Sequence, residues 1–299
     1  MPISPERKAV MAATATAAGL VVAKGAVGLA TGSMAVLASA TDSFMDLCVS
    51  LANLFALRVA ERPADDGHQY GHGKAEGFAA FLEGVVVLSA GGWIAYEAVS
   101  RLIDGQFAAP SGWPLAVMAF SLAATFFLVR YLRAVAQKTG SLILQADALH
   151  YQTDLLSNAG VLLALVLVKL LDIPAIDPAV SLLVAGYIAW GGVGVVRKGL
   201  DMLMDAAIEP EYVEAVEKAV AAQPELAGHH YLKTRRSGNQ RFVETHIVFK
   251  DPRLPLFQAH AVGDRVEAAI AEAVPGAVIT LHLDPCDDRA GECALPEAK

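Results

Sequence analysis

Two pairs of ionisable residues lie inside long apolar segments of this 299-residue chain. Asp42 and Asp46 form the first pair, and His150 and Asp154 form the second, each with a spacing of four residues. On a helix this spacing places both side chains on one face, one turn apart. Charged groups are costly in hydrocarbon and usually face a partner or a cavity there. Two facing pairs would supply three carboxylates and one imidazole, which is a ligand set for a small divalent cation.

The apolar segments that must position these pairs are long enough to cross a bilayer. Hydrophobic residues make up 55% of the chain and charged residues only 18%, whereas about 25% charged residues is usual in soluble domains. Each segment is near or above the ~20 residues that span ~30 Å of hydrocarbon. We expect six membrane-spanning helices, at 9–30, 34–58, 78–100, 112–134, 142–169 and 177–203.

The chain changes character after the sixth segment. From Ala207 onward the charge is denser and the apolar segments are short and alternating. We therefore expect a transmembrane domain over 1–206 and a soluble domain over 207–299, which ends in a short C-terminal tail. The net charge of −8 argues against a nucleic-acid partner.

Positive residues near the ends of the segments predict the orientation of the chain in the lipid bilayer. Lysine and arginine are frequent at the N-terminus, in the 2–3 and 4–5 connections and after the sixth segment, whereas the opposite loops hold little beyond Arg101 and Lys169. We therefore expect both termini and the soluble domain in the cytoplasm. At 1.5 Å per residue, both ionisable pairs then lie near the middle of a ~30 Å core, at one depth.

The ligand set of the central pairs suits zinc and also accepts cadmium, iron(II), cobalt or manganese. The single imidazole favours zinc and cadmium over manganese, because imidazole is a softer ligand than a carboxylate. Carboxylates clustered in a low dielectric repel one another, so the empty site should hold protons, which are released when a metal binds. A site open to each face in turn would exchange metal for protons. Asp147, one turn before His150, either shapes the access path or is a polar residue near the helix start.

A second candidate metal site lies on the connection between the second and third segments. Asp65, His68 and His72 follow a D-x2-H-x3-H spacing that can surround one metal, and the glycines between them allow the backbone to turn tightly. The alternative is a solvated polar loop.

The soluble domain is expected to be a small α+β sandwich of the ferredoxin-like type. The order αββαβ is predicted from a helix at 207–222, strands at 229–236 and 241–249, a helix at 256–273 and a strand at 277–283. The domain is small and lacks a nucleophile–base pattern, so we do not expect an enzyme.

Five of the eight histidines lie in this soluble domain, and they are His229, His230, His246, His260 and His282. On the last strand and its exit, His282 and Asp284 share one face. His246 on a neighbouring strand could join them in a structural or regulatory metal site. The alternative is a set of exposed histidines.

These motifs resemble those of the cation diffusion facilitator family, and within it the bacterial zinc and ferrous-iron efflux pumps. The resemblance covers nearly the whole chain and is most specific at Asp42-x3-Asp46, at His150-x3-Asp154, in the loop from Pro63 to Glu76 and at the ending His282-Leu283-Asp284-Pro285. It implies that the two central pairs form the transport site and that the loop residues bind a further metal.

For the soluble domain, the resemblance implies a two-metal site at the interface of a homodimer, with ligands that map onto His230, His246, His260, His282 and Asp284. His229 falls one residue outside that pattern. The resemblance further implies a charge interlock at the membrane boundary between Lys74 and Asp205. It also implies proton antiport and a place in the bacterial cytoplasmic (inner) membrane.

We therefore expect a six-span, proton-coupled exporter of divalent metals, with zinc first and cadmium or iron(II) as further substrates. One alternative is a non-transporting metal sensor or assembly scaffold on the same fold, which would not need all four central ligands. Another is an intramembrane aspartyl protease, which also places two aspartates in its spans. His150, and the lack of a Gly-x-Gly-Asp motif around either pair, argue against the protease.

Overall fold

The chain divides into two compact units, Met1–Leu200 and Asp201–Lys299. The computed structural model describes residues 3–31, 34–104, 115–171, 173 and 176–286. The domain boundary expected after residue 206 stays a prediction.

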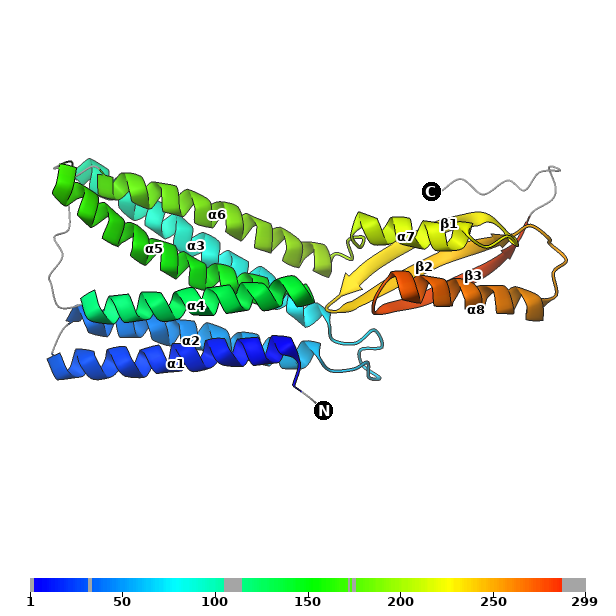
Figure 1. Ribbon diagram of the computed structural model, residues 1–299, viewed down its shortest axis with the longest axis horizontal. Coiled ribbons are helices and arrows are strands. Elements are labelled where there is room, and N and C mark those ends of the chain that lie inside the picture. The colour runs from blue at the N-terminus through cyan, green and yellow to red at the C-terminus, as the bar shows by residue number, and fades with distance from the viewer. Residues whose placement is uncertain (1–2, 32–33, 105–114, 172, 174–175, 287–299) are drawn as a thin grey trace. The chain divides into compact units, whose positions relative to one another are not determined.

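The regular secondary structure in the described part of the first unit is all helical, and its long helices run beside one another (Figure 1). In chain order they are α1 (Pro5–Thr31), α2 (Met34–Ala60), α3 (Lys74–Asp104), α4 (Leu115–Thr139), α5 (Leu142–Leu171) and α6 (Ile176–Leu203). Within the described chain, α1, α2, α3, α4 and α6 are each long and apolar enough to cross a membrane. α5 has 30 residues, which exceeds the ~20 needed to span the hydrocarbon.

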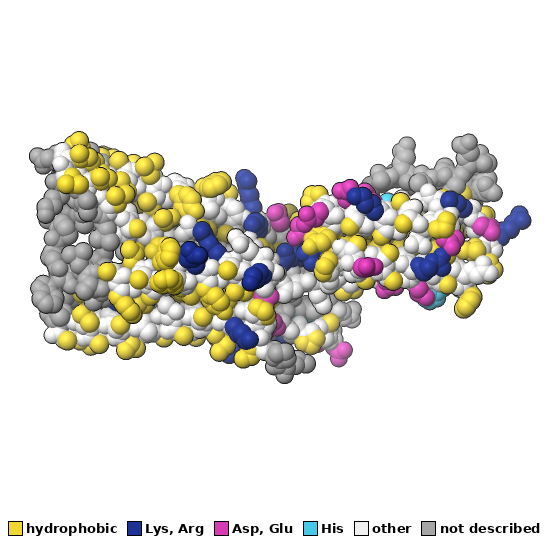
Figure 2. All heavy atoms as spheres, viewed as in Figure 1, with side chains coloured by type: hydrophobic (Ala, Val, Ile, Leu, Met, Phe, Trp, Pro, Cys, Tyr) yellow, Lys and Arg dark blue, Asp and Glu magenta, His cyan; other side chains and the backbone are white. Residues whose placement is uncertain are grey.

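The surface of this unit agrees with a membrane environment. Apolar side chains cover the helices on the face seen in Figure 2, whereas charged side chains are spread over the second unit. Large apolar side chains are exposed on several helices, among them Trp93, Phe127, Leu183 and Trp190. An apolar surface of this extent is unusual for a soluble monomer and suits contact with lipid.

Several helix boundaries differ by a few residues from the spans expected from hydropathy. α3 begins at Lys74, four residues before the expected span, and α4 continues to Thr139. α4 therefore extends beyond the span expected at 112–134, because the polar residues that follow a span can continue its helix. α4 ends at Gly140, whose φ of 69° is the left-handed conformation that favours glycine. The expected start of the fourth span, at 112, lies outside the described residues.

The start of α5 is fixed by neighbouring side chains. Glu76 Oε1 accepts a hydrogen bond from the backbone N–H of Leu142 at 2.6 Å, and Ser141 Oγ accepts one from Leu144 at 3.4 Å. These contacts satisfy N–H groups that a helix start leaves without partners. They also tie the beginning of α5 to α3.

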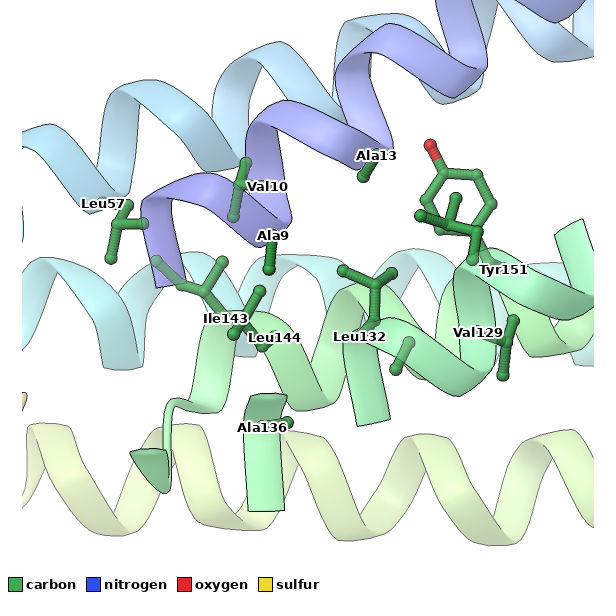
Figure 3. Packing of buried hydrophobic residues seen from close by; sticks show 12 residues of the cluster. Ala9, Val10, Ala13, Leu57, Val129, Leu132, Ala136, Ile143, Leu144 and Tyr151 are labelled. Carbon is green, nitrogen blue, oxygen red and sulfur yellow. The ribbon is translucent and has the colours of Figure 1, made fainter. Parts of the chain in front are cut away.

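A buried apolar cluster joins α1, α2, α4 and α5 (Figure 3). The small residues Ala9 and Ala13 on α1 let the backbone approach α4 and α5, where Leu132 and Leu144 fill the space. α3 and α6 also approach each other closely. A Cβ atom on Gly199 would lie 2.8 Å from the carbonyl oxygen of Gly77 on α3, so a larger residue would separate the two backbones.

The second unit confirms the expected αββαβ order. Its elements are α7 (Pro210–Ala221), β1 (Leu226–Ser237), β2 (Gln240–Phe249), α8 (Leu256–Ala273) and β3 (Ala277–Pro285). The strands form one sheet in the order β1-β2-β3, in which β1 and β2 are antiparallel and β2 and β3 are parallel.

The two helices of this unit contact each other and pack against the sheet. Val243, Ile247 and Phe249 of β2 belong to the buried cluster that also includes residues of α7 and α8. Because side chains alternate along a strand, Glu244 and His246 point to the opposite face. The described helices therefore cover only one face of the sheet.

Candidate metal centres

Helices α2 and α5 bring three of the four expected central ligands together. His150 Nε2 lies 3.2 Å from Asp46 Oδ1. Asp46, His150 and Asp154 each offer one ligand atom, and these atoms lie within 4.8 Å of one another. All three residues are half-buried. We call this group the central cluster; it can bind one divalent cation through two carboxylates and one imidazole.

Asp42 stands outside the central cluster. It lies one turn before Asp46 on α2, its side chain is exposed in the single chain, and it interacts electrostatically with Asp154. Four residues of an α-helix turn through about 400°, so two positions four apart differ by about 40° around the axis. When Asp46 faces α5, Asp42 therefore points about 40° to one side of it. Its role as a fourth ligand stays a prediction.

A hydrogen bond next to the central cluster holds α2 and α5 in register. Ser50 on α2 and Tyr151 on α5 are both buried, and their hydroxyl oxygens are 2.8 Å apart. Asp154 keeps one buried carboxylate oxygen, Oδ2, without a hydrogen-bond partner among the described residues. A buried carboxylate oxygen without a partner is costly, and a bound cation would satisfy it.

Lys24 on α1 is a further charged neighbour of the central cluster. Its Nζ donates a hydrogen bond to Ser43 Oγ at 2.9 Å, and its charge interacts with Asp42, Asp46 and Asp154. The sequence signal for Lys24 is its charge within an apolar segment, since a charged residue within a membrane span is a functional candidate by default.

The loop between α2 and α3 forms a second group, which we call the loop cluster. Asp65 Oδ1 lies 3.4 Å from His68 Nδ1, and Asp65 Oδ2 lies 3.4 Å from His72 Nε2. Asp65 Oδ1 also accepts hydrogen bonds from the backbone N–H groups of Gly67 and His68. The bond from the His68 backbone lowers the pKa of Asp65 below its ordinary value. The carboxylate therefore stays ionised and available to a metal.

The third group, the sheet cluster, lies on the sheet face that α7 and α8 leave uncovered. His230, His246 and His282 are direct neighbours in the register of β1, β2 and β3. Asp284 Oδ2 lies 3.0 Å from His230 Nε2 and 3.1 Å from His246 Nδ1, and its Oδ1 lies 3.1 Å from His282 Nε2. One carboxylate thus contacts three imidazoles from three strands.

Two histidines of this unit do not join the sheet cluster. His260 on α8 is 73% exposed and contacts Asp264 of its own helix at 3.1 Å. His229 pairs in register with Ile247, which lies in the core, and paired residues share a face of the sheet. His229 therefore lies on the face opposite the sheet cluster.

The expected charge interlock involves a residue from each unit. Lys74 is the first residue of α3, and Asp205 follows α6 with a φ of 57° and pairs with Arg235 at 3.2 Å. A link between Lys74 and Asp205 stays a prediction.

Comparison with known proteins matches both units to families. The family model described as "Cation efflux transmembrane domain" matches residues 10–204. The model described as "Cation efflux protein, cytoplasmic domain" matches residues 208–286. The second family model is also a dimerisation domain, which indicates that these proteins dimerise.

Whole-length relatives agree with these matches. The cation-efflux pump FieF of Serratia proteamaculans (strain 568) is 34% identical over 280 residues, which cover 94% of this chain and 93% of the relative. The FieF pump of Salmonella newport (strain SL254) is 35% identical over 279 residues, covering 93% and 92%. A solved zinc form of CzrB, described as a candidate zinc transporter, matches 31% of this chain and all of its own at 33% identity, with a TM-score of 0.26.

The relatives are bacterial pumps, and the apolar helices indicate a multi-pass protein of the bacterial inner membrane. Two family models match in the expected order, and the whole-length identity exceeds 30%. The chain therefore belongs to the cation diffusion facilitator family, whose members are transporters of divalent metal cations rather than enzymes.

Proposed function

We propose that this protein exports divalent metal cations from the bacterial cytoplasm in exchange for protons, with zinc as its preferred substrate. The observation that carries the proposal is the convergence of Asp46, His150 and Asp154 between the long apolar helices α2 and α5. Ionisable groups inside the hydrocarbon cost free energy, and they usually mark a path for ions or protons. A relative named as a cation-efflux pump supports export.

The chemistry of the central cluster supports zinc. Two carboxylates and one imidazole suit zinc and cadmium, and they also accept iron(II) and cobalt. Manganese prefers an all-oxygen site, so it is the weakest of these substrates. The sequence likeness to CzrB agrees with zinc as the preferred ion.

Proton coupling follows from the same ligands. Carboxylate and imidazole bind a metal only when they are deprotonated, so protons and metal compete for the central cluster. His150 binds a metal through a ring nitrogen that carries no proton, so a proton there must leave before the metal binds. The inward proton gradient would then load protons onto the central cluster as the metal leaves. In this proposal both termini and the second unit lie in the cytoplasm.

The sheet cluster supports a structural or regulatory zinc site in a homodimer. His230, His246, His282 and Asp284 lie on the sheet face that α7 and α8 leave open. His260 is exposed on α8, so a second copy of the chain could present its own His260 to this face. The two-metal site would then form only in the dimer, and zinc binding would tighten the dimer.

The test is zinc uptake into proteoliposomes with an acidic lumen, which replaces the periplasmic side. We expect the wild type to take up zinc and to release protons from the lumen at the same time. Asp46→Asn should stop both fluxes, whereas Glu97→Gln, which changes an exposed carboxylate that pairs with Arg101 on α3, should leave them unchanged. If Asp46→Asn takes up zinc as fast as the wild type, the transport proposal is wrong.

The same assay distinguishes the alternative of a metal sensor or scaffold, which the sheet cluster favours. A wild-type protein that binds zinc at the sheet cluster but moves neither zinc nor protons would be a sensor. A proton flux that accompanies zinc uptake excludes that alternative.

A further inference from the structure

Two more carboxyl groups are buried between the helices of the first unit, outside the three clusters. Glu83 on α3 is 4% exposed and Asp147 on α5 is 0% exposed. Asn53 on α2 joins them, because its Nδ2 donates hydrogen bonds to Glu83 Oε2 at 3.0 Å and to Asp147 Oδ1 at 3.3 Å. Three helices thus contribute one polar group each to one buried position.

The hydrogen bonding of this buried carboxylate pair is incomplete. Glu83 Oε1 and Asp147 Oδ2 are buried and have no hydrogen-bond partner among the described residues. In the part of the chain that the structure describes, no lysine or arginine forms an ion pair with either carboxylate. Buried carboxylates of this kind are costly unless a cation or a proton compensates them.

A line of polar contacts connects the pair to the central cluster. Along the interface of α2 and α5, Asp46 contacts His150, Ser50 contacts Tyr151, and Asn53 contacts Asp147. The three α2 residues are four and three positions apart, so they follow one face of the helix. Seven residues of helix correspond to about 10 Å along the axis, which is a short step for an ion between two sites.

We propose that Glu83 and Asp147 form a second intramembrane cation site that receives the divalent metal before it reaches the central cluster. Two carboxylates carry the charge that balances one divalent cation, and their two open oxygens would be its protein ligands. Asn53 positions both carboxylates through their other oxygens. In the orientation proposed above, this site lies on the cytoplasmic side of the central cluster, because Asp147 precedes His150 on α5.

The chemistry of the second site suits a transfer step. An oxygen-only site holds zinc less tightly than a site with an imidazole, so zinc gains affinity as it moves on to His150. Transport along several sites requires each site to bind firmly enough to be filled and weakly enough to release its ion. The direction of transfer rests on the proposed function, whereas binding of a cation by Glu83 and Asp147 does not.

The competing explanation is that Asn53, Glu83 and Asp147 only hold α2, α3 and α5 together. Isosteric variants separate the two explanations. Glu83→Gln and Asp147→Asn each keep a carbonyl oxygen that can accept the hydrogen bond from Asn53, but they remove the negative charge. A packing role would survive these variants, whereas a cation site would not.

The first experiment counts bound zinc in the full-length, detergent-solubilised protein. One ligand of each described cluster is first removed, with Asp46→Asn, Asp65→Asn and Asp284→Asn in one background. We expect about one weakly bound zinc ion per chain to remain in equilibrium dialysis, and to be lost when Glu83→Gln and Asp147→Asn are added. No zinc in the background, or zinc that the two added variants leave unchanged, would overturn the proposal. This result is independent of whether the protein transports zinc.

The second experiment measures zinc uptake into proteoliposomes. We expect Glu83→Gln and Asp147→Asn each to lower the maximal uptake rate about tenfold while zinc binding by the central cluster, measured by calorimetry, stays as in the wild type. Glu83→Asp retains the charge and should recover part of the rate, and Glu97→Gln is the matched control. Isosteric variants that fold as the wild type does, shown by size-exclusion chromatography and circular dichroism, and still transport at its rate would contradict the proposal.

Discussion

The central cluster and the sheet cluster use the same residue types in opposite proportions. The central cluster has two carboxylates and one imidazole from two helices, and Asp154 keeps an oxygen without a partner among the described residues. The sheet cluster has three imidazoles around one carboxylate, and each imidazole contacts Asp284 within 3.1 Å. A sheet register fixes ligands on neighbouring strands, whereas two helices can shift relative to each other. The first arrangement suits release of an ion and the second suits retention.

The largest effect should come from the central cluster. Asp154→Asn removes a carboxylate that converges with Asp46 and His150, and we expect zinc uptake into proteoliposomes to fall by about 100-fold or more. Zinc binding by the sheet cluster should remain, since that cluster belongs to the other unit. A variant that loses both functions would show that the two clusters are not independent.

A smaller effect is expected when the sheet cluster is altered. Asp284→Ala removes the carboxylate that all three histidines contact, and zinc affinity of this cluster should fall about 10- to 100-fold in calorimetry of the full-length protein. Asp251→Asn, at an exposed aspartate of the same unit, is the control. Transport by Asp284→Ala should persist, and its complete loss would show that the sheet cluster is needed for the transport cycle itself.

The proportion of carboxylate to imidazole ligands in the central cluster can be changed by one substitution. His150→Asp makes the central cluster all-oxygen, and we expect the ratio of zinc to manganese uptake to fall about tenfold, because manganese prefers oxygen ligands. The measurement is uptake of each metal by the same proteoliposome preparation. An unchanged ratio would mean that ligand type does not set the selectivity.

The loop cluster should give the smallest effect, because its aspartate and His68 are exposed. The pKa of Asp65 lies below its ordinary value, chiefly through the hydrogen bond from the His68 backbone. A lowered pKa keeps this carboxylate ionised, and its contribution is lost only as the pH falls through that lowered value. Acid should therefore release zinc from the loop while Asp65 is still charged, because protons compete with the metal for the other ligands.

It follows that Asp65→Asn should weaken zinc binding by the loop a few-fold to about tenfold without moving the midpoint of its pH dependence. Asp66→Asn, at the next exposed residue, is the matched control. Zinc titrations of the full-length protein between pH 5 and pH 8 measure the effect. A midpoint that moves with Asp65→Asn would assign the acid sensitivity to the carboxylate instead.

The sequence predicted the ligands better than their arrangement. The four-residue spacing in α2 and α5 and the alternation of β3 were sufficient to propose Asp46, His150, Asp154, His282 and Asp284, because helix and strand periods determine which residues share a face. The αββαβ order followed from the same periods. The register that aligns His230 with His246 needed the structure, since a pairing of strands is a long-range contact.

What the sequence could not give is the rotation of one helix against another. That rotation brings Asp46 against α5 and leaves Asp42 exposed, and it depends on contacts such as the one between Ser50 and Tyr151. Glu83 and Asn53 were missed for a different reason. Each is a single polar residue in an apolar run, and only the packing of three helices shows that they share one buried position with Asp147.

The row of histidines across β1, β2 and β3 has a consequence for how much of this protein a cell retains. β3 is the last described strand and joins the sheet only through a parallel pairing that needs the α8 crossover. A zinc ion that bridges the three strands would stabilise the folded unit by about 2.7 kcal/mol at a free concentration 100 times its dissociation constant. Chains made when zinc is scarce would unfold more often and be degraded sooner. The supply of zinc would thereby adjust the number of pumps without any change in their synthesis.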